Sequence, residues 1–231
     1  MDAVIPKTVF YIFSLPISDT LFSTWVMMAI IIIIAFLIRK FKPALGEMIV
    51  EMIYNIVSSV MPDDINLAKY LPFLGTLAIF LVFGNIFSVV PRMVSPTANL
   101  NTTAALAILV LLAVYFYGIR EKGVLGFLKD LANPIFMLPM EIVGQVSRTL
   151  SLAVRLFGNI LSTDLIVAIV FSLIPFIAPL PLIALGMLTG LLQAYIFIVL
   201  AALYVGSAIE VEAMEKERRI LKQEVSKTYI N

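Results

Sequence analysis

The feature that most constrains the fold is a stretch without any charged residue, from Leu165 to Ile209. It is too long for one membrane helix, because about 20 helical residues cross the roughly 30 Å hydrocarbon core of a bilayer. Three prolines, Pro175, Pro179 and Pro181, interrupt its middle, and proline tends to end helices. The stretch therefore predicts two apolar helices that are joined by a turn and embedded in a membrane.

The composition of the whole chain supports the same class. Of 231 residues, 61% are hydrophobic and 13% are charged, whereas soluble domains average about 45–50% and about 25%. This excess of apolar residues excludes a secreted module, a nucleic-acid-binding protein, a conventional soluble enzyme and a disordered chain. The chain has no Cys and no His, so we expect neither a thiolate nucleophile nor a metal site nor a bound cofactor.

Apolar periodicity predicts an all-α polytopic membrane protein, with about five membrane helices and one amphipathic surface helix in a single membrane domain over residues 1–231. The last two membrane helices are about 50 Å long at 1.5 Å per residue, so we expect them to form a steeply tilted hairpin. The expected segments are spans at 21–38, 71–90 and 104–119, an amphipathic helix at 44–61, the tilted hairpin at 139–173 and 182–212, and a cytoplasmic tail at 213–231.

Basic residues predict the orientation. Arg39, Lys40 and Lys42 directly follow the first expected span, and Lys and Arg are enriched in cytoplasmic loops. Most of the 16 basic residues then lie on the cytoplasmic side. We therefore expect the N-terminus outside the cell and the C-terminus in the cytoplasm, and residues 1–19 do not resemble a signal peptide.

Ionisable residues within the first hairpin helix are the functional candidates, because charges at membrane depth are costly. Arg155 shares one narrow helical face with six polar residues, namely Glu141, Gln145, Arg148, Ser151, Asn159 and Ser162. Asp164 falls on the opposite face. The pattern suggests two separate water-filled pathways. One follows the polar face from Glu141 towards Arg155 and opens to the cytoplasm, and the other reaches Asp164 from outside. An alternative is that Glu141 and Arg148 simply pair to stabilise the bundle.

Arg155 has no carboxylate three or four residues away. Since arginine keeps its proton, it suits the role of a fixed positive charge, whereas Glu141 and Asp164 can accept and release protons. The last helix carries a sparse polar face with Gln193 at its centre, together with Thr189, Tyr204 and Ser207. Gln193 could hydrogen-bond Arg155, line water or only join helices.

The segments SLAVRLFGN at Ser151–Asn159 and LQAYIFIVLAALY from Leu192 resemble subunit a of the rotary ATP synthases, the membrane stator that faces the c-ring. PTANLNTTAALA after the second span and YGIREKG at the end of the third extend the resemblance over most of the chain. The short N-terminus is similar to bacterial members, so the resemblance implies the bacterial inner membrane.

The resemblance implies a role for each matching position. Arg155 matches the stator arginine, and Asp164 matches the carboxylate near the outer half-channel. Further matches are Asn159 beside the arginine, Gln193 on the last helix, Glu141 and Ser151 in the cytoplasmic half-channel, and Asn85 on an earlier span. Some relatives have His where this chain has Gly186, and Asp where it has Ser88. Other possible channel-lining residues are Ser88, Gln145, Arg148, Ser162, Thr189, Tyr204 and Ser207.

The function implied is a non-catalytic, ion-translocating subunit. Two offset half-channels would deliver ions to and from carboxylates of the c-ring, and Arg155 would prevent leakage between them. The implied partners are the c-ring, subunit b or an equivalent peripheral stalk, and membrane lipid, but no nucleic acid. A secondary transporter and a non-conducting membrane scaffold are the alternatives, and the sequence leaves H+ and Na+ open as the coupling ion.

Overall fold

The computed structural model describes the backbone of residues 8–12, 15–62, 66–88, 95–131, 138–174 and 177–228. Side chains are described for residues 19–62, 66–88, 95–121, 123, 139–140, 143–174 and 177–209. A short antiparallel hairpin, β1 (Thr8–Ile12) and β2 (Leu15–Ser18), precedes the first helix and was not predicted. The helices are α1 (Asp19–Phe41), α2 (Pro43–Ser58), α3 (Leu71–Phe87), α4 (Leu100–Leu131), α5 (Leu138–Leu173) and α6 (Pro179–Thr228), with 3-10 turns η1 (Leu67–Lys69) and η2 (Pro96–Ala98).

The predicted fold class, a helical polytopic membrane protein, is confirmed. Four helical segments of the described chain are long and apolar enough to cross a membrane, and α3 is a shorter apolar helix of 17 residues. Their outer faces are oily: Ile32 and Phe36 of α1 are each 66% exposed. Such surface is unfavourable in water but stable against lipid.

Two helices extend beyond the expected membrane segments. The helix expected to end at residue 119 continues as α4 to Leu131, with a break at Gly123, whose φ of 70° suits glycine. The last helix, α6, likewise continues beyond the hairpin segment expected at 182–212 and reaches Thr228 in the tail. Its charged part has acidic and basic residues four apart, such as Glu212 and Lys216, which favours a helix without any apolar partner.

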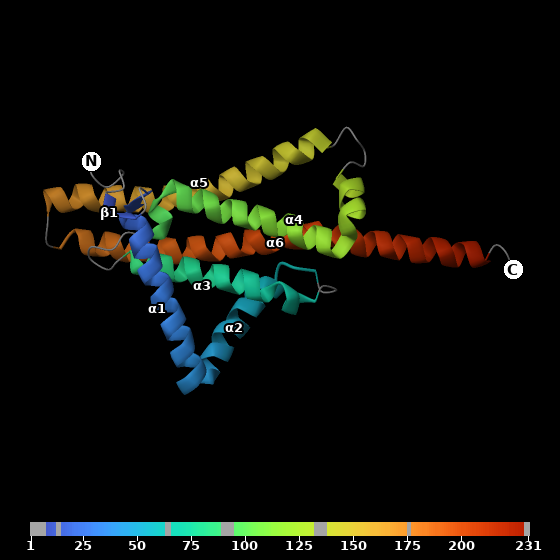
Figure 1. Cartoon of the computed structure of the whole chain (residues 1–231), viewed down its shortest axis with the longest axis horizontal. Coiled ribbons are helices and arrows are strands. Elements are labelled where there is room, and N and C mark those ends of the chain that lie inside the picture. The colour runs from blue at the N-terminus through green and yellow to red at the C-terminus, as the bar shows by residue number, and fades with distance from the viewer. Residues whose placement is uncertain are drawn as a thin grey trace.

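Figure 1 shows α3, α4, α5 and α6 running side by side along the long axis of the molecule. α1 and α2 form a V on one side of this bundle, and the C-terminal part of α6 extends beyond it. α5 and α6 form the expected antiparallel hairpin. α6 also packs against α3 and α4, so it is the helix that the other long helices share.

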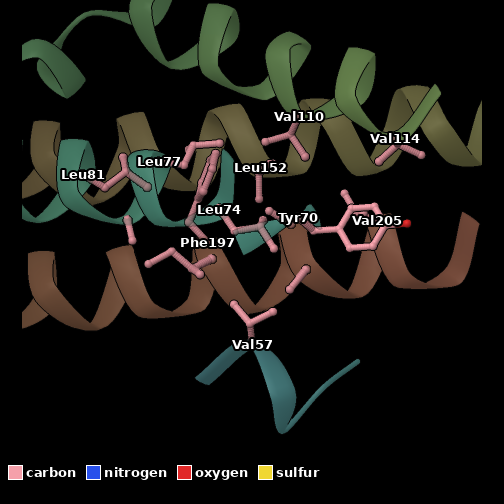
Figure 2. Close-up of a cluster of buried hydrophobic side chains, with 14 of the residues drawn as sticks. Val57, Tyr70, Leu74, Leu77, Leu81, Val110, Val114, Leu152, Phe197 and Val205 are labelled. Carbon is pink, nitrogen blue, oxygen red and sulfur yellow. The ribbon is translucent and has the colours of Figure 1, made fainter. Parts of the chain in front are cut away.

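The core lies where these helices meet α2 (Figure 2). Its buried side chains come from α2, η1, α3, α4, α5 and α6, and include Val57, Leu67, Leu74, Val110, Leu152 and Phe197. α6 contributes the small, fully buried residues Ala194, Ala201 and Ala202. Small residues let helix backbones approach closely in membranes, so α6 can lie at the centre of the bundle.

A polar cluster joins η1 to α4 at one end of the bundle. Lys69 Nζ lies 2.9 Å from Glu121 Oε1, and the hydroxyl of Tyr70 donates to the same oxygen at 3.2 Å. The ring of Tyr70, 2% exposed, packs edge-on against Tyr117 at 4.8 Å between centroids. The cluster fixes the start of α3 against the middle of α4.

Replacing Phe197 by Ala tests the position of the core. Phe197 is 0% exposed, and truncating a buried Phe costs about 3–5 kcal/mol. We expect a clear drop in the thermal midpoint of the detergent-solubilised chain, followed by circular dichroism. Phe171→Ala is the matched control, because Phe171 is 57% exposed on α5; equal losses for both variants would contradict this core.

Candidate functional site

The two arginines of the polar face of α5 lie on the surface of the chain. Arg148 and Arg155 are both exposed, and neither forms an ion pair with any residue that the structure describes. Glu141 lies in α5, but its side chain is outside the described residues, so the alternative in which it pairs with Arg148 is untested. Ser151 and Ser162 are exposed as well. Within the described residues, this face of α5 therefore presents two arginines that have no ion-pair partner.

A cavity of about 150 Å³ lies between α3, α5 and α6. This α3–α5–α6 cavity is lined by Asn85, Ser88, Asn159, Ile160, Thr163, Asp164, Val167, Ile183, Gly186 and Met187. The structure thus brings together four residues that the sequence analysis had named on different segments: Asn85, Ser88, Asn159 and Asp164. At roughly 30 Å³ per water molecule, the cavity has room for several waters.

Two asparagines bind α3 and α5 to the main chain of α6. Asn85 Nδ2 donates to the carbonyl oxygen of Gly190 at 2.8 Å, and Asn159 Nδ2 donates to that of Thr189 at 3.2 Å. Because a carbonyl group can only accept, each amide must present its nitrogen to α6. Asn85 and Asn159 therefore hold three helices in register through two successive carbonyls.

The two hydroxyl groups of the cavity also use their protons on the main chain. Ser88 Oγ donates to the carbonyl oxygen of Asn85 at 2.6 Å, and Thr163 Oγ1 donates to that of Asn159 at 3.0 Å. A hydroxyl has one proton to donate, so only lone pairs remain for the cavity. Together with the Asp164 carboxyl group, these oxygens favour donors such as water, a hydrated proton or a small hard cation.

Glycines on α6 make room for this arrangement. A Cβ atom on Gly190 would lie 2.9 Å from Asn85 Cγ, and one on Gly186 would overlap Cγ2 of Thr163. Thr163 was not predicted as a lining residue. Its position between Asn159 and Asp164 on the helical wheel was the available signal.

The polar residues of α6 do not form one continuous pathway. Gln193 is 7% exposed, and its Nε2 atom has no hydrogen-bond partner among the described residues. The structure shows no hydrogen bond from Gln193 to Arg155, in contrast to one of the expected arrangements. Thr189 and Ser207 donate to carbonyl groups of their own helix, those of Gly186 and Tyr204 respectively.

A second polar site lies two turns before Arg155, where α4, α5 and α6 meet. The guanidinium carbon of Arg148 lies 5.6 Å from the centroid of the Tyr204 ring. A cavity of about 10 Å³ adjoins this pair, and Gln145 is among its lining residues. The structure therefore brings together three predicted residues, Gln145, Arg148 and Tyr204, away from the α3–α5–α6 cavity.

Comparison with known proteins identifies the family of the chain. The family model described as "ATP synthase A chain" matches residues 21–206, which is most of the chain. The chain belongs to this family. The match includes α1 to α5, both cavities, and the part of α6 that contains Gln193 and Tyr204.

Relatives named ATP synthase subunit a come from several bacteria. The chain is 49% identical over 133 residues to "ATP synthase subunit a 2" of a Picosynechococcus species, covering 57% of this chain and 56% of the relative. It is 52% identical over 114 residues to the subunit of Albidiferax ferrireducens, covering 49% of each. The chain thus spans about half the length of these two relatives. With the Legionella pneumophila subunit it shares 36% identity over 217 residues, covering 90% of this chain and 94% of the relative.

Replacing Gly190 by Ala tests the attachment of α3 to α6. The added methyl group would collide with Asn85 and disturb its hydrogen bond, and overpacking a well-packed site costs about 1–3 kcal/mol. We expect a lower thermal midpoint in detergent. Gly144→Ala is the control, because no heavy atom lies within 4 Å of its added Cβ and Ala favours a helix by roughly 0.5–1 kcal/mol over Gly. A Gly190→Ala variant as stable as Gly144→Ala would contradict the packing described.

Proposed function

We propose that this chain is the ion-conducting stator subunit of the membrane sector of an ATP synthase. The observation that carries the proposal is a combination found in a member of this family: an exposed Arg155 without an ion-pair partner among the described residues, and a separate cavity lined by Asp164. An exposed fixed cation is suited to meet a carboxylate that another subunit brings to it. A hydrated cavity is suited to supply that carboxylate with an ion.

The outer half-channel is assigned to the α3–α5–α6 cavity. Asp164 would exchange the ion with water there, and the lone pairs of Ser88 and Thr163 would solvate it. A second, cytoplasmic half-channel would follow the face of α5 from Arg155 towards Glu141, with Ser151 along it. Asn159 contacts both α6 and the outer cavity, so it would mark the boundary between the two routes.

Arg155 would separate the two routes and drive release of the ion from the ring carboxylate. A carboxylate neutralised by an ion can face lipid at tolerable cost, whereas an ionised one cannot. Beside Arg155 the ionised form is favoured, so the carboxylate gives up its ion to the cytoplasmic route. The membrane potential supplies about 2.3 kcal/mol per charge per 100 mV, and the ring turns because each carboxylate must change state to pass Arg155.

The proposal also covers the membrane in which the chain acts, its orientation and its partners. It would act in the bacterial inner membrane, with the N-terminus outside and the C-terminus in the cytoplasm, and without catalytic activity of its own. Its partners would be the c-ring, subunit b or an equivalent peripheral stalk, and lipid. ATP-driven ion uptake into vesicles, with and without Na+ and with a protonophore, distinguishes H+ from Na+ as the coupling ion.

Replacing Arg155 by Gln tests the central role. We expect ATP synthesis driven by an imposed ion gradient in vesicles to fall to background, because the carboxylate of the ring loses its cationic partner. Arg120→Gln is the matched control, since Arg120 is also exposed but lies at the far end of the apolar part of α4. Retained synthesis in Arg155→Gln would overturn the proposal. Loss of the assembled complex would favour a scaffold, and ion flux in vesicles without a ring would favour a secondary transporter.

Replacing Asp164 by Asn tests the outer half-channel. The amide cannot carry an ion by exchanging protons, so we expect synthesis to fall at least tenfold while the complex stays assembled. Asp164→Glu should retain a measurable share of the activity. Asp19→Asn, at the start of α1, is the control for loss of a carboxyl group. Unchanged synthesis by Asp164→Asn over a series of external pH values would argue against this role.

A further inference from the structure

Arg148 is held by an aromatic ring rather than by an acid. Its guanidinium carbon lies 5.6 Å from the centroid of Tyr204 on α6, within the range of a cation–π interaction. Among the residues that the structure describes, no carboxylate pairs with it. Unlike an ion pair, this contact fixes the position of the cation without cancelling its charge.

The described residues that line the small cavity beside this contact carry no charge apart from that of Arg148. α4 contributes only apolar side chains to the small cavity beside it, such as Val110 and Val114. α5 contributes Gln145, Thr149 and Leu152 there, and Tyr204 is the one titratable group that α6 adds. The acidic residue of α5 that lies nearest in sequence is Glu141, whose side chain is outside the described residues. Little in this environment screens the charge of Arg148 from the protein side.

Tyr204 is attached to a rigid part of α6. Its neighbours Ala201, Ala202 and Val205 are all 0% exposed, so the backbone that carries the ring is packed on its other side. Buried, close-packed segments change position little. The ring is therefore a fixed platform, while Arg148 is a long and exposed side chain that would otherwise sample many rotamers.

We propose that Tyr204 is a positioning residue that holds Arg148 as a second fixed positive charge, and that this charge promotes release of the ion to the cytoplasmic side. The inference rests on the proposed function. Arg148 is seven residues before Arg155, which is about 10 Å along a helix at 1.5 Å per residue. A ring carboxylate beside Arg155 would thus lie about 10 Å from Arg148. At an effective dielectric constant of about 20, a charge at that distance changes an ionisation equilibrium by about one pH unit.

The test uses the assembled complex in vesicles and measures ATP synthesis against the pH of the cytoplasmic side. Without the second charge the ring carboxylate holds its proton more tightly, so release needs a higher cytoplasmic pH. We expect the midpoint of the pH profile of ATP synthesis to rise by about one pH unit in Arg148→Gln and by a smaller amount in Tyr204→Leu. If Na+ is the coupling ion, the cytoplasmic Na+ concentration that half-inhibits synthesis should instead fall about tenfold in Arg148→Gln.

Conservative variants separate positioning from general structure. Arg148→Lys keeps the charge and Tyr204→Phe keeps the ring, so both should retain the wild-type profile. The double variant Arg148→Gln/Tyr204→Leu should shift no further than Arg148→Gln alone, because the ring acts only through the charge. Full additivity of the two shifts would overturn the role of Tyr204.

Three further outcomes would overturn either this proposal or the proposed function. An unchanged pH profile of ATP synthesis in assembled Arg148→Gln overturns the proposal. Because Arg148 is exposed, this substitution leaves the core in place, so the test can be made even if Tyr204→Leu fails to assemble. Reduced assembly in Arg148→Gln without any shift of the profile would mean a structural contact only, which also overturns it. Synthesis retained by Arg155→Gln would instead refute the proposed function, so the two failures are distinguishable.

Discussion

Two hydrogen bonds from asparagine side chains to successive carbonyls of α6 set the arrangement of the three helices around the larger cavity. Lipid offers no partner for a polar group, so Asn85 and Asn159 must find partners within the protein. Gly190 permits the contact because it has no side chain, and Asn85 then reaches its carbonyl at 2.8 Å. Since the amide nitrogens are held by α6 and the hydroxyl protons by nearby carbonyls, the chemistry of the cavity follows from the way in which the helices are joined.

This packing keeps the acceptor oxygens of the larger cavity apart from the two arginines of α5. Acceptor oxygens gather between α3, α5 and α6, where Asp164 is the ionisable member. The arginines of α5 stay exposed, with Arg148 against an aromatic ring and Arg155 without a described partner. A direct pairing of Asp164 with Arg155 would have cancelled both charges. Their separation leaves one helix able to offer a cation to a partner and an acid to water.

The sequence predicted most of the helices and most of the polar residues, because length, prolines and apolar periodicity determine where membrane helices lie. It placed Asp164 opposite to Asn159, yet both line one cavity. A helical wheel gives the angle of a side chain but not the shape of the space that neighbouring helices leave beside it. Thr163 was missed because a threonine in an apolar helix most often bonds its own backbone, as it also does here. α6 continues beyond its apolar part because charge pairs four residues apart, rather than apolar residues, favour a helix there.

Gly186 and Thr163 face each other across the hairpin at the edge of the larger cavity. Any side chain at Gly186 would overlap the methyl group of Thr163, so these two positions constrain each other across the hairpin. In this chain the threonine fills that space and contributes an oxygen whose proton is already used by the main chain. Within the described residues, the ionisable group that lines this cavity is therefore the carboxyl group of Asp164.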